Sequence, residues 1–142
     1  MIYLDDRMRE LLYSAMDDRC TCLLGTADGE GKPQISMKGS VMVFDRETLA
    51  YWERAKRSAL DNVAANPNVV IFYRNSPLRI TWRFHGKAVV YESGAIRDNV
   101  MYRTVQAELD RDPERQGAAV LVKIDSITDL AGNVLQGRDE EC

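Results

Sequence analysis

The order of elements is set by the stretch LAYWERAKRSALDNVAANPNVV, residues 49–70. It passes from an aromatic strand end, through a basic cluster, into a helix that begins at Ser58 with a capping-box pattern. Apolar residues at helical spacing continue this helix to Asn66, and Pro67 ends it before a second apolar strand. The stretch therefore predicts a strand, a short helix and another strand in close succession.

The basic cluster in this stretch consists of Arg54, Lys56 and Arg57, immediately before the helix. The unpaired N–H groups and the positive dipole end of a helix N-terminus suit a phosphate, and neighbouring Arg and Lys side chains add charge-assisted hydrogen bonds. One interpretation is thus a phosphate-binding point at Ser58. The alternative is a solvated face of surface charges.

Length and charge restrict the classes of function. The 142 residues suit a single domain, residues 1–142, with one core. A net charge of -3 and a pI near 5.2 provide no broad basic surface, so nucleic acid is not an expected partner. The N-terminus lacks the pattern of a signal peptide, and no apolar run approaches the roughly 18 residues of a membrane span. We therefore expect no membrane partner and a cytoplasmic location.

The three cysteines fit a reducing compartment better than a disulfide framework. Cys20 and Cys22 share one face if they lie in a strand. Together with His85 on another segment they fall short of the four ligands of a typical zinc site. We expect buried thiols and no metal site.

Hydrophobic periodicity predicts the remaining elements. A helix is expected at 5–17, within an N-terminal segment 1–18, and a second helix at 97–110. Strands are expected at 20–27, 34–43, 69–73, 78–91 and 118–125, with another ending at Trp52. Residues 130–142 are expected to form a flexible tail.

Six strands joined mostly by short turns predict a mainly β fold with flanking helices. An antiparallel barrel hides the edges of such a sheet by closing it. The strand at 69–73 is apolar on both sides, so a helix or a second subunit should cover its outer face. A homodimer is the expected assembly.

The elements in this order resemble the FMN-binding split β-barrel family typified by pyridoxamine 5'-phosphate oxidase. The resemblance covers roughly residues 20–91. It rests on Gly31-Lys32-Pro33-Gln34-Ile35-Ser36, on the helix end Asn62-Val63-Ala64-Ala65-Asn66-Pro67-Asn68-Val69, and on Phe72-Tyr73 followed by Arg83-Phe84-His85-Gly86-Lys87-Ala88. It implies a six-stranded split-barrel homodimer with FMN between the subunits and the phosphate near the helix after the third strand.

Carried over by position, the resemblance implies cofactor contacts from a set of residues on several segments. They are Ser36, Met37, Lys38, Trp52, Ser58 and Thr81. The oxidases have Arg and Lys where this chain has Ser36 and Ala59, so Arg54, Lys56 and Arg57 are expected to replace the lost phosphate contacts. Asp61 would compete with a phosphate for the helix dipole. The residues with which the oxidases hold the substrate phosphate are not recognisable here.

The expected function is that of an FMN-dependent oxidoreductase or flavin reductase, acting on a small-molecule substrate or electron donor. Its chemistry would belong to the cofactor, so no catalytic residue is assigned. Two alternatives remain. One is a non-catalytic carrier of FMN, of the deazaflavin F420 or of haem; the other is a dimeric barrel that has lost its cofactor site.

Overall fold

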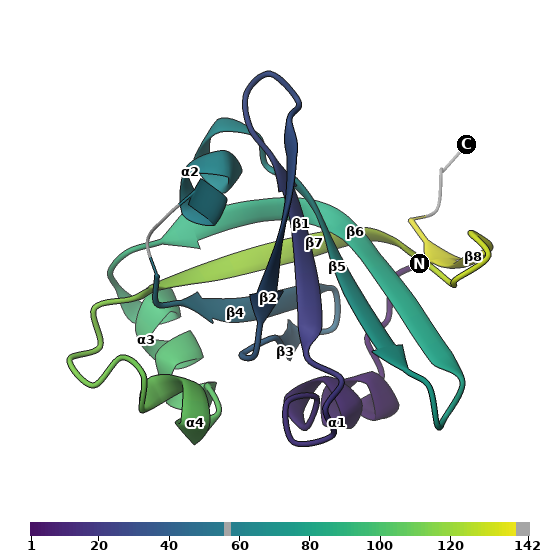
Figure 1. Cartoon of the computed structure of the whole chain (residues 1–142), viewed down its shortest axis with the longest axis horizontal. Helices are drawn as coiled ribbons and strands as arrows, with labels where there is room; N and C mark the ends of the chain where they lie inside the picture. The colour runs from purple at the N-terminus through teal and green to yellow at the C-terminus, as the bar shows by residue number, and fades with distance from the viewer. Residues whose placement is uncertain (56–57, 139–142) are drawn as a thin grey trace.

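The computed structural model describes residues 1–55 and 58–138 (Figure 1). In chain order the elements are α1 Asp6–Tyr13, β1 Cys22–Ala27, β2 Pro33–Lys38, β3 Met42–Asp45, β4 Thr48–Glu53, α2 Ser58–Ala65, β5 Asn68–Asn75, β6 Ile80–Tyr91, α3 Ala95–Arg103, α4 Gln106–Leu109, β7 Ala118–Thr128 and β8 Val134–Gly137.

One antiparallel sheet contains all the described strands, in the order β2-β1-β5-β6-β7-β4-β3, with β8 paired to β7. The sheet curls until the β1–β2 hairpin lies across β4 (Figure 1). Its two end strands, β2 and β3, do not pair with each other, so the barrel is split. The mainly β fold with flanking helices is confirmed, but the described strands number eight rather than six.

One added strand comes from a break in the predicted strand 34–43. Gly39 and Ser40 form a turn that separates β2 from β3. The Ser40 hydroxyl accepts a hydrogen bond from Trp52 N at 2.9 Å and donates one to Trp52 O at 3.2 Å. These bonds hold the corner against β4, so the chain leaves one end of the sheet and enters the other.

The other added strand is β8, which lies in the segment expected to be a flexible tail. It pairs with the end of β7, and its side chains contact the N-terminal residues. Tyr3 N donates to Gln136 Oε1 at 2.7 Å, and Gln136 Nε2 donates to Tyr3 O at 3.0 Å. Residues 139–142, including Cys142, lie outside the described residues.

The N-terminal helix α1 is shorter than the predicted 5–17 and continues as turns to Arg19. Asp5 caps it by accepting a hydrogen bond from Met8 N at 2.9 Å. Its buried residues Met8 and Leu12 pack against the open end of the barrel. The predicted helix 97–110 is two helices, because Thr104 adopts an extended conformation between α3 and α4.

The barrel interior is filled by the inward side chains of the long strands. The predicted alternation in β6 is confirmed, since Trp82 and Phe84 are buried. Trp82 stacks on Tyr73 of β5 at a centroid distance of 5.3 Å and meets Phe84 edge-on at 5.9 Å. The strand predicted at 20–27 begins at Cys22, which is buried, whereas Cys20 precedes the strand and is half-buried.

The outer side of β2, β1 and β5 carries apolar side chains in two rows. Met37, Leu23 and Phe72 are register partners in one row, and Ile35 and Val70 flank Gly25 in the other. We call these five side chains the outer apolar face. Ile35 and Met37 are 71% and 69% exposed, so within a single chain this face remains open to solvent.

No helix in the described ranges is both long enough and apolar enough to cross a membrane.

Candidate functional site

The candidate site begins with the alternation of side chains along β2. Ser36 and Lys38 point to the barrel side, opposite the buried Leu24 and Cys22 of β1. Met37 lies between them in sequence and therefore points to the outer apolar face. Two of the three residues predicted on this strand are thus brought together, and the third is directed away from them.

Lys38 forms a buried ion pair with Glu53, the last residue of β4. Its Nζ donates to the two carboxylate oxygens at 2.7 and 2.8 Å, and the side chains are 12% and 1% exposed. Nζ also lies 5.6 Å from the ring centroid of Tyr51. The pair joins β2 to β4 across the split of the barrel and compensates the charge of Lys38.

Tyr51 supplies the aromatic ring on this side of β4. Burial raises the pKa of its phenol far above the ordinary value, and the Glu53 carboxylate raises it further. The phenol therefore remains neutral and can donate a hydrogen bond at physiological pH. Tyr51 and Glu53 were not predicted as site residues, although their two-residue spacing in a strand places them on one face.

Arg54 follows β4 and forms an ion pair with α4. Its Nε donates to Glu108 Oε1 at 3.2 Å, and the Glu108 side chain is largely buried. Arg54 was predicted to replace a lost phosphate contact. In this structure the Glu108 carboxylate compensates the charge of Arg54, just as Glu53 compensates that of Lys38.

Helix α2 begins at Ser58, which is exposed, and has Asp61 in its first turn. The helix is fixed to the barrel by Asn62, whose Nδ2 donates to Thr26 Oγ1 of β1 at 3.1 Å. The two remaining predicted cations, Lys56 and Arg57, lie outside the described residues.

Trp52 lies on the opposite face of β4 from Tyr51 and Glu53. Its ring is buried in a cluster with Val100 and Leu109, under α3 and α4. The Arg97 guanidinium lies over this ring, with its Cζ 4.8 Å from the ring centroid. Alternation in the strand turns the Trp52 ring away from Lys38, and the contact of Trp52 with a cofactor stays a prediction.

Asp112 holds Trp52 and the following loop in place. Trp52 Nε1 and Gly117 N donate to its Oδ2 at 2.9 and 2.8 Å, and Gln116 N donates to Oδ1 at 2.9 Å. Burial alone would raise the pKa of Asp112, but the hydrogen bonds outweigh burial and hold the pKa below its ordinary value.

We expect Asp112→Asn to lower the free energy of unfolding by about 1–3 kcal/mol near neutral pH, because an amide cannot accept all three bonds. A depressed carboxyl pKa stabilises the fold above the unfolded-state pKa and ceases to do so as pH falls through the folded-state value. The difference from the parent should therefore shrink below about pH 4. Urea unfolding of parent and variant at several pH values measures the difference in stability. Asp110→Asn, at an exposed aspartate, serves as the control. A difference that does not change with pH would contradict the lowered pKa of Asp112.

Thr81 lies near the start of β6, paired with Arg74 of β5. It borders a pocket of about 390 Å³ that Arg74 and Arg79 also line. Arg74 is six residues farther along β5 than Asn68, which follows α2, so Thr81 is roughly 20 Å from that end of the strand. Figure 1 shows the β5–β6 turn and α2 at opposite ends of the sheet. Thr81 also lies three strands from Ser36 and Lys38 and, next to the inward Trp82, faces the outer side of the sheet, so a single chain does not bring these residues together.

Comparison with known proteins places this barrel in a family. The family model described as pyridoxamine 5'-phosphate oxidase matches residues 4–128. The chain belongs to the pyridoxamine 5'-phosphate oxidase family. Among curated proteins, no sequence is a significant match.

Solved structures with low sequence identity share the fold of this family member. The crystal structure of Group A Streptococcus HupZ has 21% identity and a TM-score of 0.72, covering 93% of this chain and 98% of that one. An FMN-binding protein from Syntrophomonas wolfei has 14% identity and a TM-score of 0.67, covering 89% and 88%. A structure named F420 reductase has 16% identity and a TM-score of 0.59, covering 82% and 95%.

The residues of this family member offer a polar but electrically balanced cradle. Ser36 and Lys38 place a hydroxyl and an ammonium donor on the barrel side of β2, with Lys38 next to the buried ring of Tyr51. Lys38 and Arg54 are each compensated by a buried carboxylate. The donors fit the uncharged, hydrogen-bonding ring of a flavin better than they fit its phosphate, which would depend on Lys56, Arg57 and the N-terminus of α2.

Proposed function

We propose that this protein binds FMN as a homodimer and acts as an oxidoreductase or flavin reductase on a small molecule. The observation that carries the proposal is the pair of polar donors, Ser36 and Lys38, on the barrel side of β2, within a fold that the family model matches from residue 4 to 128. The neighbour from Syntrophomonas wolfei, named as an FMN-binding protein, supports the choice of cofactor.

The protein's own contribution would be binding and orientation. A bound flavin would supply the acceptance of a hydride or of single electrons. In the proposal, the Ser36 hydroxyl and the Lys38 ammonium donate hydrogen bonds toward the ring, and Lys56 and Arg57 contact the phosphate. Glu53 keeps the charge around Lys38 balanced.

Two observations on this chain support the proposed homodimer. The outer apolar face presents two apolar rows to solvent, and burying them against a second copy would be favourable. Thr81 lies three strands from Ser36 in the sheet and on its outer side, so in the proposal it reaches a cofactor beside Ser36 from the partner subunit. The dimer would thus complete the site.

FMN titration tests the cofactor assignment. We expect purified protein to keep a flavin absorption spectrum after free ligand is removed, and Lys56→Ala/Arg57→Ala to weaken FMN affinity at least tenfold. Arg46→Ala, an exposed arginine on the turn before β4, is the control and should bind as the parent does. If neither the parent nor the control retains flavin, the FMN assignment fails.

Met37→Glu is expected to convert the dimer to a monomer, because it places a charge on the most exposed part of the outer apolar face, at β2. Sedimentation velocity at micromolar concentration measures the change. Tyr102→Glu, on α3, replaces an aromatic side chain that is 85% exposed and should leave the dimer intact. Unchanged sedimentation of the Met37 variant would rule out this face as the interface.

A second candidate function is that of a non-catalytic carrier of FMN, F420 or haem. The balanced charges around Lys38 and Arg54 favour it, because they would leave a phosphate-bearing cofactor loosely held. The neighbour named F420 reductase brings the deazaflavin into consideration. Titration with F420 and haemin, followed by a search for turnover with NADH or NADPH, separates the two functions.

A further inference from the structure

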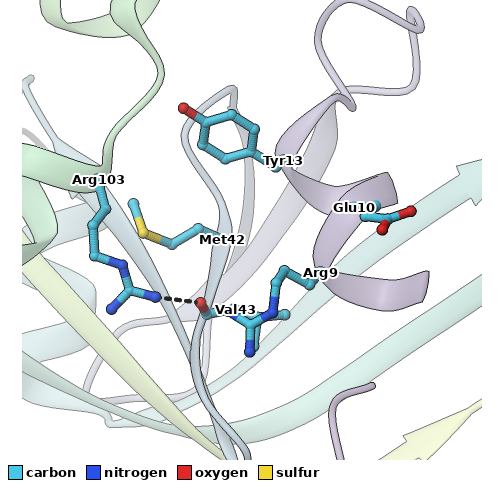
Figure 2. Close-up of a pocket in the computed structure, with 6 residues that line it drawn as sticks. All are labelled: Arg9, Glu10, Tyr13, Met42, Val43 and Arg103. Atoms are coloured by element: carbon cyan, nitrogen blue, oxygen red, sulfur yellow. Dashed lines mark hydrogen bonds between the residues drawn. The ribbon is translucent and has the colours of Figure 1, made fainter. Parts of the chain in front are cut away.

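A pocket of about 430 Å³ lies between α1, β3 and α3, apart from the cofactor site proposed above (Figure 2). Its lining consists of Arg9, Glu10, Tyr13, Met42, Val43 and Arg103. None of these residues belongs to the predicted cofactor site. The volume falls in the range of small-molecule sites.

Arg103 of α3 is held in the wall of this pocket by uncharged partners. Its Nη2 donates to Val43 O at 2.8 Å and to Phe44 O at 3.2 Å, while Nη1 donates to Asn99 Oδ1 at 3.2 Å. The guanidinium also lies 5.0 Å from the Phe44 ring centroid. Within residues 1–55 and 58–138 no carboxylate pairs with Arg103, so a fixed and uncompensated positive charge lines the pocket.

Arg9 of α1 contributes a second positive charge. It is exposed, and no hydrogen bond or ion pair to its side chain occurs among the described residues. Arg9 and Tyr13 are one helical turn apart and therefore lie on the same side of α1. Figure 2 shows the guanidinium groups of Arg9 and Arg103 on either side of Val43, with the Glu10 carboxylate pointing away from both.

The rest of the lining is largely apolar. Met42 and Val43 are buried, and the Tyr13 ring is about half-exposed. An apolar ligand body would gain by covering the half-exposed Tyr13 ring, while the two guanidinium forks match the planar geometry of a carboxylate. A free phosphate would pair with the arginines but leave the Tyr13 ring exposed.

We propose that the pocket between α1, β3 and α3 binds a small monocarboxylate with an apolar body, its carboxylate between Arg9 and Arg103 and its body against Met42 and Tyr13. This ligand would occupy a site distinct from the flavin. The juxtaposition of two uncompensated guanidinium groups with an apolar wall carries the assignment.

Benzoate serves as the test ligand, titrated into the full ¹⁵N-labelled chain and followed by amide chemical shifts. We expect saturable shifts centred on Met42, Val43 and Tyr13. Arg9→Gln and Arg103→Lys should each weaken the affinity at least tenfold. Arg7→Gln on the same helix removes an exposed arginine outside the lining and should bind as the parent does.

Comparison ligands make the proposal refutable. Benzamide has the same shape without the charge and should bind at least tenfold more weakly than benzoate. Equal binding of benzamide, or of inorganic phosphate, would overturn the assignment, as would the absence of saturable shifts in the parent. The Arg9 side chain makes no hydrogen bond or ion pair among the described residues, so Arg9→Gln remains decisive even if Arg103→Lys perturbs folding.

Discussion

Lys38→Met is expected to lower the free energy of unfolding by about 3–5 kcal/mol, because it leaves Glu53 as an unpaired buried charge. The Glu53 side chain is 1% exposed, and both its oxygens accept bonds from Lys38 Nζ. Methionine conserves the length of the side chain but cannot donate a hydrogen bond. Urea unfolding followed by circular dichroism measures the loss.

Two further variants separate the charge effect from a loss of packing. Lys38→Met/Glu53→Leu removes both charges and should recover most of the lost stability, since an apolar pair of similar volume replaces a buried ion pair at little cost. Lys87→Met breaks the exposed pair with Asp125, 3.4 Å apart, and should cost at most about 1 kcal/mol. Equal losses for Lys38→Met and Lys87→Met would show that burial of the Lys38 pair contributes nothing.

Gly86→Ala is expected to lower the free energy of unfolding by about 3 kcal/mol, at the upper end of the usual cost of overpacking. A Cβ on Gly86 would lie 2.3 Å from the backbone oxygen of Lys123 and 3.0 Å from Val122 Cγ1. The obstruction is backbone, so β6 and β7 would have to separate at the point where their register shifts. Thermal and urea unfolding both report the change.

Gly29→Ala is the matched control for this substitution. Gly29 lies in the turn between β1 and β2, and the nearest atom to a Cβ there is Ala65 Cβ at 3.9 Å. We expect its effect to stay within about 0.5 kcal/mol. A loss as large as that of Gly86→Ala would mean that backbone freedom, rather than contact with β7, sets the cost.

Periodicity predicted most of the fold because the long strands keep one face in the core. The alternation in β6 is regular enough to place Trp82 and Phe84 inside without any structure. The break after β2 was missed because Gly39 and Ser40 continue the two-residue alternation of the strand, in which a small or apolar residue follows each polar one. The corner depends on hydrogen bonds from Ser40 to Trp52, twelve residues away, which periodicity does not register.

The candidate site was predicted less completely than the fold. Ser36 and Lys38 follow from the family resemblance and from alternation in one strand. The pairing of Lys38 with Glu53 joins residues fifteen positions apart on strands that are not neighbours in the sheet, so only the closed barrel reveals it. For Trp52 the sequence alone was sufficient. Trp52 and Glu53 are consecutive residues of one strand, so their side chains must lie on opposite faces of it.

The contacts between β8 and the N-terminal residues have a consequence for hydrogen exchange. Strand ends and chain ends ordinarily fray, and their amides then exchange within the shortest times. Here Tyr3 N is bonded to the Gln136 side chain, and Leu4 N donates to Arg46 O at 2.9 Å. The amide proton of Tyr3 should therefore exchange only when β8 opens, and that of Leu4 only when the turn before β4 opens. Conditions that raise or lower the protection of amides in β8 and in that turn should change the protection of Tyr3 and Leu4 in the same direction.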